Sequence, residues 1–397
     1  MIILKRKAPI LLILLISITF VVPSISYGIV LSNVDKFSKS SILIDQDTGR
    51  VLYEKNPDEK RPLASLSKMM TFLIAIEAIN NKEVNKDDII VIDKDIAKVR
   101  GSSYHLKVGE EVPLIELMKG LMIVSGNDAA VGIAKHIGKS EAKFVERMNK
   151  RAKEIGMTNT SFVNCNGLPI YSLADPKKPP KENISTARDI AILGKYMMDN
   201  YEKEVTSITD MQTYTYEKRG FCKNNTNGLL SIIPEVDGIK TGYTGNAGYC
   251  LAFSMKINED NKTMENRLIG VSLGANHKNK RIQACLAMLK YGRENFTTEK
   301  VMSKEELIGK KYLKGLNELE ITLENEDDLI IIKKNDEDIN TQITFKELKL
   351  PIKKGDVLGV IKYYNEDGEI LATGKIVSRN DLDNISLKTK IKMIFAD

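Results

Sequence analysis

The stretch Ser65-Leu66-Ser67-Lys68 opens a segment, residues 62–80, that carries Pro62 at its entry and a dense apolar run from Met69 to Ile79. This pattern predicts a core helix. Ser65 and Lys68 are three positions apart, so a helix presents both side chains on one face. A serine hydroxyl is a weak nucleophile until a base removes its proton, and a lysine does so only when burial or a nearby cation lowers its pKa. The spacing therefore predicts a nucleophile and its base near a helix N-terminus, whose free N–H groups favour a developing oxyanion.

A second polar motif, Ser125-Gly126-Asn127, separates two apolar segments, residues 113–124 and 128–137, that are predicted as helices. A break between two core helices projects polar side chains into a cleft. There Ser125 can relay a proton between a lysine and a leaving group. Asn127 can both donate to a substrate carbonyl and accept from a lysine.

A third motif, Lys240-Thr241-Gly242, lies on the first strand of a hairpin predicted over residues 236–256. Alternation turns Lys240 and Gly242 to one face of that strand. An edge strand offers backbone groups to an extended peptide, and Gly242 allows the peptide to approach closely. Thr241 offers a hydroxyl to a carboxylate. Lys240 supplies positive charge and is a candidate for the cation that lowers the pKa of Lys68.

Each motif alone is weak evidence. A second S-x-x-K pattern occurs at Ser140–Lys143 and a second S-x-N pattern at Ser378–Asn380, whereas K-T-G occurs once. A lone S-x-x-K more often holds a capping serine and a solvated lysine. The full set, in this order and in suitable local contexts, predicts an acyl-serine active site.

The remaining elements alternate between strands and helices. We expect a hairpin over 41–54, a proline-rich surface loop over 164–184, a helix that opens with the capping box Thr186-Ala187-Arg188-Asp189, and a helix around 279–292.

The pattern changes near residue 299. Short apolar runs at 329–332, 341–345 and 357–364, separated by turn residues, predict a small all-β module. The length of 397 residues fits two domains. We expect a signal peptide over 1–28, a catalytic domain over 29–298 and a β-rich C-terminal domain over 299–397.

The N-terminus has the features of a secretory signal peptide. Three basic residues at 5–7 precede an apolar stretch over 9–22, and small residues follow, with cleavage expected near Ser26 or Gly28. An uncleaved anchor is the alternative, although a spanning helix usually needs about 20 apolar residues. Removing these three charges from the net charge of +6 leaves +3. That balance gives no indication of nucleic-acid binding; it suits an anionic cell-wall surface and a near-neutral soluble protein equally.

The four cysteines allow three full pairings: Cys165, Cys222, Cys250 and Cys285. Cys250 and Cys285 lie in apolar segments, where a free buried thiol is typical, so we expect no disulfide. The chain has no C-x-x-C spacing and its three histidines are far apart, so we expect no zinc site.

These motifs resemble the D-alanyl-D-alanine carboxypeptidases, or low-molecular-weight penicillin-binding proteins, over about residues 38–297. The resemblance to this family extends to the sequence segments Asp47-Thr48-Gly49, Leu63-Ala64-Ser65, Ser125-Gly126-Asn127-Asp128-Ala129-Ala130 and Asp237-Gly238-Ile239-Lys240-Thr241-Gly242-Tyr243-Thr244. The β-rich tail resembles the C-terminal domain of the same group. The resemblance implies an α+β fold: an antiparallel sheet flanked by helices with the cleft at the sheet edge, followed by a small all-β domain.

The resemblance also implies catalytic roles. Ser65 would be acylated by the penultimate D-Ala carbonyl of a peptidoglycan stem peptide, with Lys68 as the base. Ser125 would pass a proton to the leaving D-Ala. The backbone N–H groups of Ser65 and Tyr243 would form the oxyanion hole, and water would release the acyl-enzyme.

Binding roles follow from the same resemblance. Asn127 would hold the substrate, and Lys240 and Thr241 would bind its terminal carboxylate beside Gly242. Arg281 matches a position where relatives keep an arginine near that carboxylate, although the residues around it match poorly.

The implied partners are peptidoglycan stem peptides and, as covalent inhibitors, β-lactam antibiotics; no metal, cofactor or nucleic acid is implied. We expect an exported protein at the extracytoplasmic face of the membrane or in the cell wall. The final segment, Ser386–Asp397, alternates lysines with apolar residues. It fits a short membrane anchor and a last strand equally.

Two rival functions remain. A class A β-lactamase shares the acylation residues, but its Glu-x-x-Leu-Asn motif does not occur here, and Gly126 replaces the Asp of S-D-N. The second rival is a non-catalytic wall-binding or penicillin-sensing module. The intact Ser65, Lys68 and Lys240 argue against it, because a binding module needs no activated nucleophile. Transpeptidation by the same acyl-enzyme stays open, since it differs only in whether water or an amine attacks.

Overall fold

The structure is a computed structural model that describes residues 34–175, 177–258, 265–312 and 320–382. The predicted signal peptide and the final segment Ser386–Asp397 lie outside the described residues. Within the described ranges, no helix is long and apolar enough to cross a membrane.

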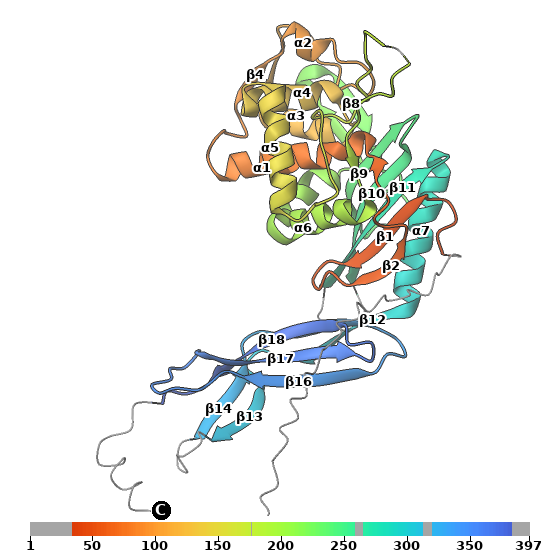
Figure 1. Ribbon diagram of the computed structural model, residues 1–397. Helices are drawn as coiled ribbons and strands as arrows, with labels where there is room; N and C mark the ends of the chain where they lie inside the picture. The colour runs from red at the N-terminus through yellow and green to blue at the C-terminus, as the bar shows by residue number, and fades with distance from the viewer. Residues whose placement is uncertain (1–33, 176, 259–264, 313–319, 383–397) are drawn as a thin grey trace, which may run out of the picture. The chain divides into compact units, whose positions relative to one another are not determined.

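The first domain is built on a five-stranded antiparallel sheet in the order β2-β1-β11-β10-β9 (Figure 1). The two predicted hairpins are confirmed: β1 pairs with β2, and β9 pairs with β10. The strand that carries the K-T-G motif, β9, lies at the edge of the sheet, as expected. The bounds of these strands are β1 Ser40–Asp45, β2 Val51–Lys55, β9 Val236–Thr244, β10 Gly248–Asn258 and β11 Glu265–Ala275.

The helices of this domain agree with most of the predicted segments. Their bounds are α1 Lys68–Asn80, α2 Lys94–Ala97, α3 Leu114–Met122, α4 Asn127–Gly138, α5 Glu141–Glu154, α6 Ala187–Thr209 and α7 Lys278–Asn295. Two 3₁₀ turns accompany them, η1 at Ala64–Ser67 and η2 at Glu217–Arg219. Three short two-stranded sheets complete the domain: β3 Arg61–Pro62 with β6 Ile184–Ser185, β4 Ile89–Val91 with β5 Glu111–Pro113, and β7 Thr213–Tyr216 with β8 Phe221–Asn224.

Successive residues of the sheet face opposite sides, which explains why it has helices on both faces. In β1, Ile42 and Ile44 pack into a core shared with α1, α3, α4, α5 and α6, while Leu43 packs into a second core with α7. In β10, Ala252 and Phe253 divide in the same way. Figure 1 shows α6 and α7 on opposite faces of the sheet. The strands are therefore apolar on both faces because both are covered.

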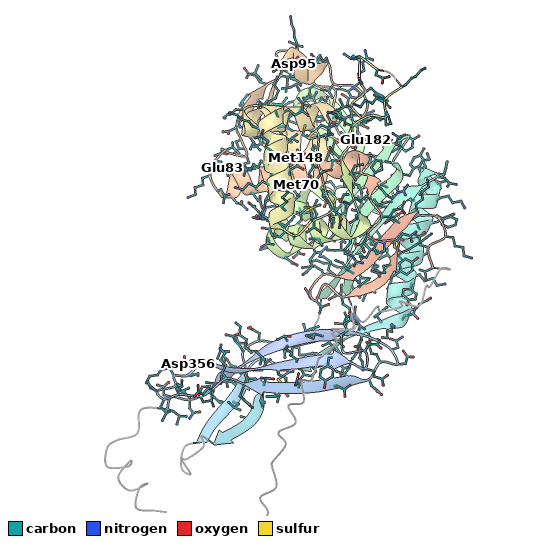
Figure 2. All side chains as sticks on the ribbon, in the orientation of Figure 1. Met70, Glu83, Asp95, Met148, Glu182 and Asp356 are labelled. Atoms are coloured by element: carbon teal, nitrogen blue, oxygen red, sulfur yellow. The ribbon has the colours of Figure 1, made fainter. Side chains whose placement is uncertain are left out.

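The larger core holds the helical layer. Met70 of α1 and Met148 of α5 are fully buried within it (Figure 2). Almost the whole of α1 is buried, including its first residue, Lys68. A helix that is apolar on nearly all sides is a central one. The end of the S-x-x-K motif therefore stands on the most enclosed helix of the domain.

The predicted start of that helix was wrong. Pro62 belongs to strand β3, and a 3₁₀ turn over Ala64–Ser67 intervenes before α1 begins at Lys68. Ala64 has a φ of 48°, a left-handed conformation that interrupts any continuous helix from Pro62. The serine and the lysine thus lie on two consecutive elements.

Of the two hydrogen bonds of the predicted capping box before α6, the structure confirms the one accepted by the N-cap side chain. Thr186 is the N-cap, and its side chain accepts a hydrogen bond from the backbone N–H of Asp189. The Asp189 carboxylate accepts from Asn159 N and from Thr160 Oγ1. It therefore also links α6 to the segment that follows α5.

The second domain is the predicted all-β module. Its strands form a five-stranded sheet in the order β13-β14-β18-β17-β16 and a two-stranded sheet of β12 and β15. Its core includes Leu329, Ile331, Leu358 and Ile361. The bounds are β12 Phe296–Met302, β13 Leu307–Tyr312, β14 Glu320–Asn325, β15 Leu329–Lys334, β16 Ile339–Phe345, β17 Val357–Asn365 and β18 Ile370–Ser378.

All four cysteines are free thiols, as expected, and Cys165, Cys250 and Cys285 are buried. The domain boundary at 298 and 299 stays a prediction.

Candidate active site

Lys68 and Ser65 are in direct contact. Lys68 Nζ donates to Ser65 Oγ at 2.8 Å, to Asn127 Oδ1 at 2.7 Å and to the backbone oxygen of Asn166 at 2.7 Å. The side chain of Lys68 is completely buried. An ammonium group has three protons, so these three acceptors satisfy all of them. Of the three acceptors, Ser65 belongs to the first predicted motif and Asn127 to the second, whereas nothing in the sequence indicated Asn166.

Burial lowers the pKa of Lys68 to about 7, although the nearby Cys165 thiol and Asp128 carboxylate act in the opposite direction. The sequence left two causes open, burial and a nearby cation for which Lys240 was the candidate. In the structure burial is the cause at Lys68. Burial also lowers the pKa of Lys240 far below its usual value, and there the charges of Lys68 and Arg281 add to the effect. A lysine whose pKa lies near neutrality is a competent general base at physiological pH.

The 3₁₀ turn that carries Ser65 is held between two glycines. A side chain at Gly167 would place its Cβ only 1.9 Å from the backbone oxygen of Ala64. A Cβ at Gly242 of β9 would lie 3.0 Å from Leu63 O and 3.1 Å from Ser65 N. Gly242 thus allows a close approach of β9 to the turn that carries Ser65; the close approach of a substrate to Gly242 stays a prediction.

The Ser125-Gly126-Asn127 motif forms the junction between α3 and α4. Ser125 has a φ of 64°, and it is almost fully buried. Backbone strain of this kind in a non-glycine residue is typical of functional sites. Among the described residues, nothing is hydrogen-bonded to the Ser125 hydroxyl, so its proton and lone pairs stay available.

Asn127 is fixed from three sides. Its Oδ1 accepts from Lys68, its Nδ2 donates to Arg100 O at 2.8 Å, and its backbone N–H donates to Ser102 O at 2.8 Å. The expectation that this asparagine accepts from a lysine is confirmed. One proton of the amide nitrogen remains for a substrate carbonyl.

The K-T-G motif brings a buried charge to the sheet edge. Lys240 is 1% exposed, and its Nζ donates to the backbone oxygen of Thr241 at 3.1 Å. Thr241 Oγ1 donates to Thr226 Oγ1 at 2.8 Å. Tyr243, by contrast, is 56% exposed, and its ring stacks on Tyr249 of β10 with centroids 4.2 Å apart.

Arg281 of α7 supplies a second buried cation on this side. Its Nη1 donates to Cys250 O at 3.3 Å, and its Nε has no hydrogen-bond partner. Neither Arg281 nor Lys240 forms an ion pair within the part of the chain that the structure describes. Unpaired buried cations are costly unless an anion arrives. The pair is therefore suited to an anionic group such as a carboxylate.

Sequence reasoning missed the contribution of residues 164–167. Four prolines led us to assign 164–184 to a surface loop. Residues from 171 onward are largely exposed, but Asn164, Cys165 and Asn166 are buried, and Asn166 O contacts Lys68. The run Asn-Cys-Asn-Gly was the available signal, because Asx turns followed by glycine mark a tight backbone turn.

No group of three or more His, Cys, Asp or Glu side chains suited to a metal ion occurs in the described ranges.

The comparisons with known proteins point to one family. The sequence pattern of "D-alanyl-D-alanine carboxypeptidase" matches residues 30–277, and that of "Penicillin-binding protein 5, C-terminal domain" matches residues 296–384. The curated D-alanyl-D-alanine carboxypeptidase DacF of Bacillus subtilis is 34% identical over 366 residues, which cover 91% of this chain and 90% of that protein.

Solved structures agree with this match. Penicillin-binding protein 5 from Haemophilus influenzae superimposes with a TM-score of 0.73 at 29% identity, covering 88% of this chain and 98% of the other. Penicillin-binding protein D2 from Listeria monocytogenes, in its ampicillin-bound form, superimposes with a TM-score of 0.56 at 29% identity and covers 64% of this chain and 97% of the other.

Proposed function

Because this chain belongs to the D-alanyl-D-alanine carboxypeptidase family, we propose that it removes the terminal D-alanine of peptidoglycan stem peptides through an acyl-enzyme on Ser65. The observation that carries the residue assignment is the 2.8 Å hydrogen bond between Lys68 Nζ and Ser65 Oγ, made by a lysine whose pKa is about 7.

In the acylation step, neutral Lys68 accepts the proton of Ser65 Oγ as that oxygen attacks the carbonyl carbon of the penultimate D-Ala. The N–H groups of Ser65 and Tyr243 donate to the oxyanion. Collapse of the tetrahedral intermediate breaks the peptide bond. Ser125 passes a proton to the leaving amine, and Lys68 replaces that proton, so D-alanine leaves neutral at nitrogen.

The substrate binds along the edge of β9. Its terminal carboxylate is held by Lys240 and the Thr241 hydroxyl, with Arg281 as an additional positive charge. The buried and unpaired state of both cations supports this assignment. Asn127 donates its remaining amide proton to a substrate carbonyl. Gly242 keeps the strand close to the turn that carries Ser65.

Deacylation requires a base for the attacking water, and we assign Lys68 to this step too. Ser65 Oγ then recovers its proton from Lys68. If one group serves both steps, the acylation and deacylation rate constants will share the same ionisation in their pH profiles. A second, distinct ionisation in deacylation would assign a different base to the water.

β-Lactams would acylate the same serine as mimics of the D-Ala-D-Ala terminus, since a relative of this chain was solved with ampicillin bound. The enzymes of this family act on the cell wall, outside the cytoplasm. For this chain we propose export through residues 1–28 and a location at the extracytoplasmic face of the cell membrane or in the cell wall.

The test is D-alanine release from a stem pentapeptide that ends in D-Ala-D-Ala, compared with the same peptide ending in L-Ala-L-Ala. We expect release from the first only, and none from Ser65→Ala. Folded protein that releases no D-alanine but turns over a penicillin within seconds would favour the β-lactamase. Folded protein that does neither would leave the non-catalytic module.

A further inference from the structure

The third acceptor of Lys68 Nζ is a carbonyl that belongs to no helix or strand. Asn166 lies in an irregular segment between α5 and β6. Its backbone oxygen is 2.7 Å from Lys68 Nζ, the same distance as the Asn127 side chain. A carbonyl in irregular backbone has no ladder to fix its position, so something else must orient it.

Asn164 orients that carbonyl from inside the same turn. Its Oδ1 accepts from the backbone N–H of Gly167 at 2.7 Å and from that of Asn166 at 3.2 Å, while its Nδ2 donates to Leu168 O at 2.7 Å. These bonds enclose the peptide group between Asn166 and Gly167, whose carbonyl contacts Lys68. Asn164 is 6% exposed, so water offers no ready substitute.

Asn183 holds Asn164 in turn and connects the turn to the nucleophile. Its Oδ1 accepts from Val163 N at 2.7 Å and its Nδ2 donates to Asn164 O at 3.0 Å. Its backbone oxygen accepts from Leu63 N at 3.0 Å, two residues before Ser65. Asn183 is 1% exposed. A single buried residue thus links, through its backbone oxygen and its side-chain amide, the backbone on both sides of the Ser65–Lys68 contact.

We propose that the buried pair Asn164 and Asn183 are positioning residues that set the reactivity of Lys68 by fixing the Asn166 carbonyl against its Nζ. Neither side chain is hydrogen-bonded to Ser65 or Lys68. The inference rests on the proposed function, because it concerns the base of that reaction.

The charges that face Lys68 come from three other elements. Asp128 stands in the first turn of α4, the Cys165 thiol lies in the turn and donates to Glu141 of α5, and Lys240 lies on β9. Asp128, Glu141 and Lys240 lie outside the turn that Asn164 holds, whereas Cys165 follows Asn164 directly within it. A hydrogen bond to the ammonium form favours that form, so misplacing the Asn166 carbonyl lowers the pKa of Lys68. A new carboxylate at position 164 raises it.

The test measures acylation by a chromogenic cephalosporin, by stopped flow from pH 5 to 9, in the full-length protein. For Asn164→Ala we expect the acylation rate constant at its plateau to fall about tenfold with little change in the initial binding constant. We expect the acid limb of its pH profile to move to lower pH by about one unit, the size that a lost hydrogen bond to a charged group implies. Asn164→Asp, which keeps the acceptor oxygen, loses the Nδ2 donor to Leu168 O and adds a negative charge, should move that limb to higher pH.

The matched control is Asn149→Ala. Asn149 holds the backbone of Phe162, with Oδ1 accepting from its N–H and Nδ2 donating to its oxygen, both at 2.8 Å. It therefore anchors the start of the same loop without contacting the turn at Asn166. We expect a lower melting temperature and an unshifted pH profile.

Folded Asn164 variants whose profiles coincide with that of the wild type would overturn the positioning role while leaving the proposed function intact. If Asn164→Ala does not fold, Asn164→Asp alone tests the inference. An acid limb of its pH profile at the same pH as in the wild type would overturn the positioning role. Absence of acylation at Ser65 in the wild type would overturn both proposals, and the D-alanine assay reads that failure independently.

Discussion

The chain carries the pattern S-x-x-K twice, and the two copies do entirely different things. At Ser65 and Lys68, the lysine is fully buried and donates to the serine hydroxyl at 2.8 Å. At Ser140 and Lys143, the serine is the N-cap of α5, its hydroxyl accepts from the lysine's backbone N–H at 3.3 Å, and the lysine side chain is exposed. Spacing alone therefore sets proximity, and the surroundings decide the chemistry.

Local backbone explains the difference between the two copies. Ser140 has φ −158° and ψ 154°, the extended conformation that lets an N-cap hydroxyl reach back to the first turn. Ser65 is inside a 3₁₀ turn, where its hydroxyl points toward Lys68 at the next turn. That turn exists because Gly167 and Gly242 press against it from two other segments. Remote parts of the chain thus convert a common cap sequence into a buried serine–lysine contact.

The largest effect that separates the two copies is covalent labelling. Ser65→Ala should abolish labelling by a fluorescent penicillin, because no other hydroxyl contacts Lys68 Nζ in the described residues. Ser140→Ala should label like the wild type. Gel fluorescence over time, with the fold of each variant checked by circular dichroism, makes the measurement. Persistent labelling of Ser65→Ala would move the nucleophile elsewhere.

The two lysines give the next largest contrast. Lys68→Met should lower the acylation rate constant by about 10³-fold, the usual range for a lost general base. Lys143→Met should leave it unchanged, because its ammonium group lies in solvent. Stopped-flow acylation of both variants is the measurement. Equal rate constants in the wild type and Lys68→Met would mean that another group takes the proton of Ser65.

The ionisation of Lys68 supplies a smaller and graded effect. Because the base form is the neutral amine and the pKa of Lys68 is about 7, the acylation rate constant should rise tenfold per unit up to about pH 7 and then level off. Protonation of Lys68 below that pH removes the base, so the part of the pH profile below pH 7 reports the ionisation of Lys68. The profile is measured by acylation from pH 5 to 9 at constant ionic strength. A rate constant that still climbs tenfold per unit at pH 9 would show a lysine with an ordinary pKa.

Much of the fold was predictable because it rests on local patterns. The hairpins β1–β2 and β9–β10, the helices α3, α4 and α7, and the β-rich second domain all follow from periodicity and turn residues. The start of α1 was not predictable in this way. Pro62 is favourable at a helix entry, but its pairing with Ile184 and the left-handed Ala64 depend on segments that are distant in sequence.

The residues of the site likewise fall into those that could be predicted from the sequence and those that could not. Lys68, Asn127 and Lys240 could be identified because motif spacing and residue chemistry indicate them. The Asn166 carbonyl could not, because any residue has a backbone oxygen and only the fold decides which one meets Lys68. The sequence left two sources open for a lowered pKa of Lys68, burial and a nearby cation, for a related reason. The sequence shows nearby charges as candidates, whereas burial is a property of the packed molecule.

The smallest expected effect belongs to the second copy of the motif and is purely structural. Ser140→Ala removes the N-cap of α5 and should lower the free energy of unfolding by about 1 kcal/mol. Ser140→Asp keeps a capping oxygen and adds a favourable charge at the helix N-terminus, so it should match or exceed the wild type. Urea denaturation of both variants, read by circular dichroism, tests the ranking, and acylation rate constants serve as the control. If Ser140→Ala slowed acylation as well as lowering the free energy of unfolding, the two copies would be coupled through α5. Glu141, which accepts a hydrogen bond from Cys165 beside Lys68, would then be the connection to examine.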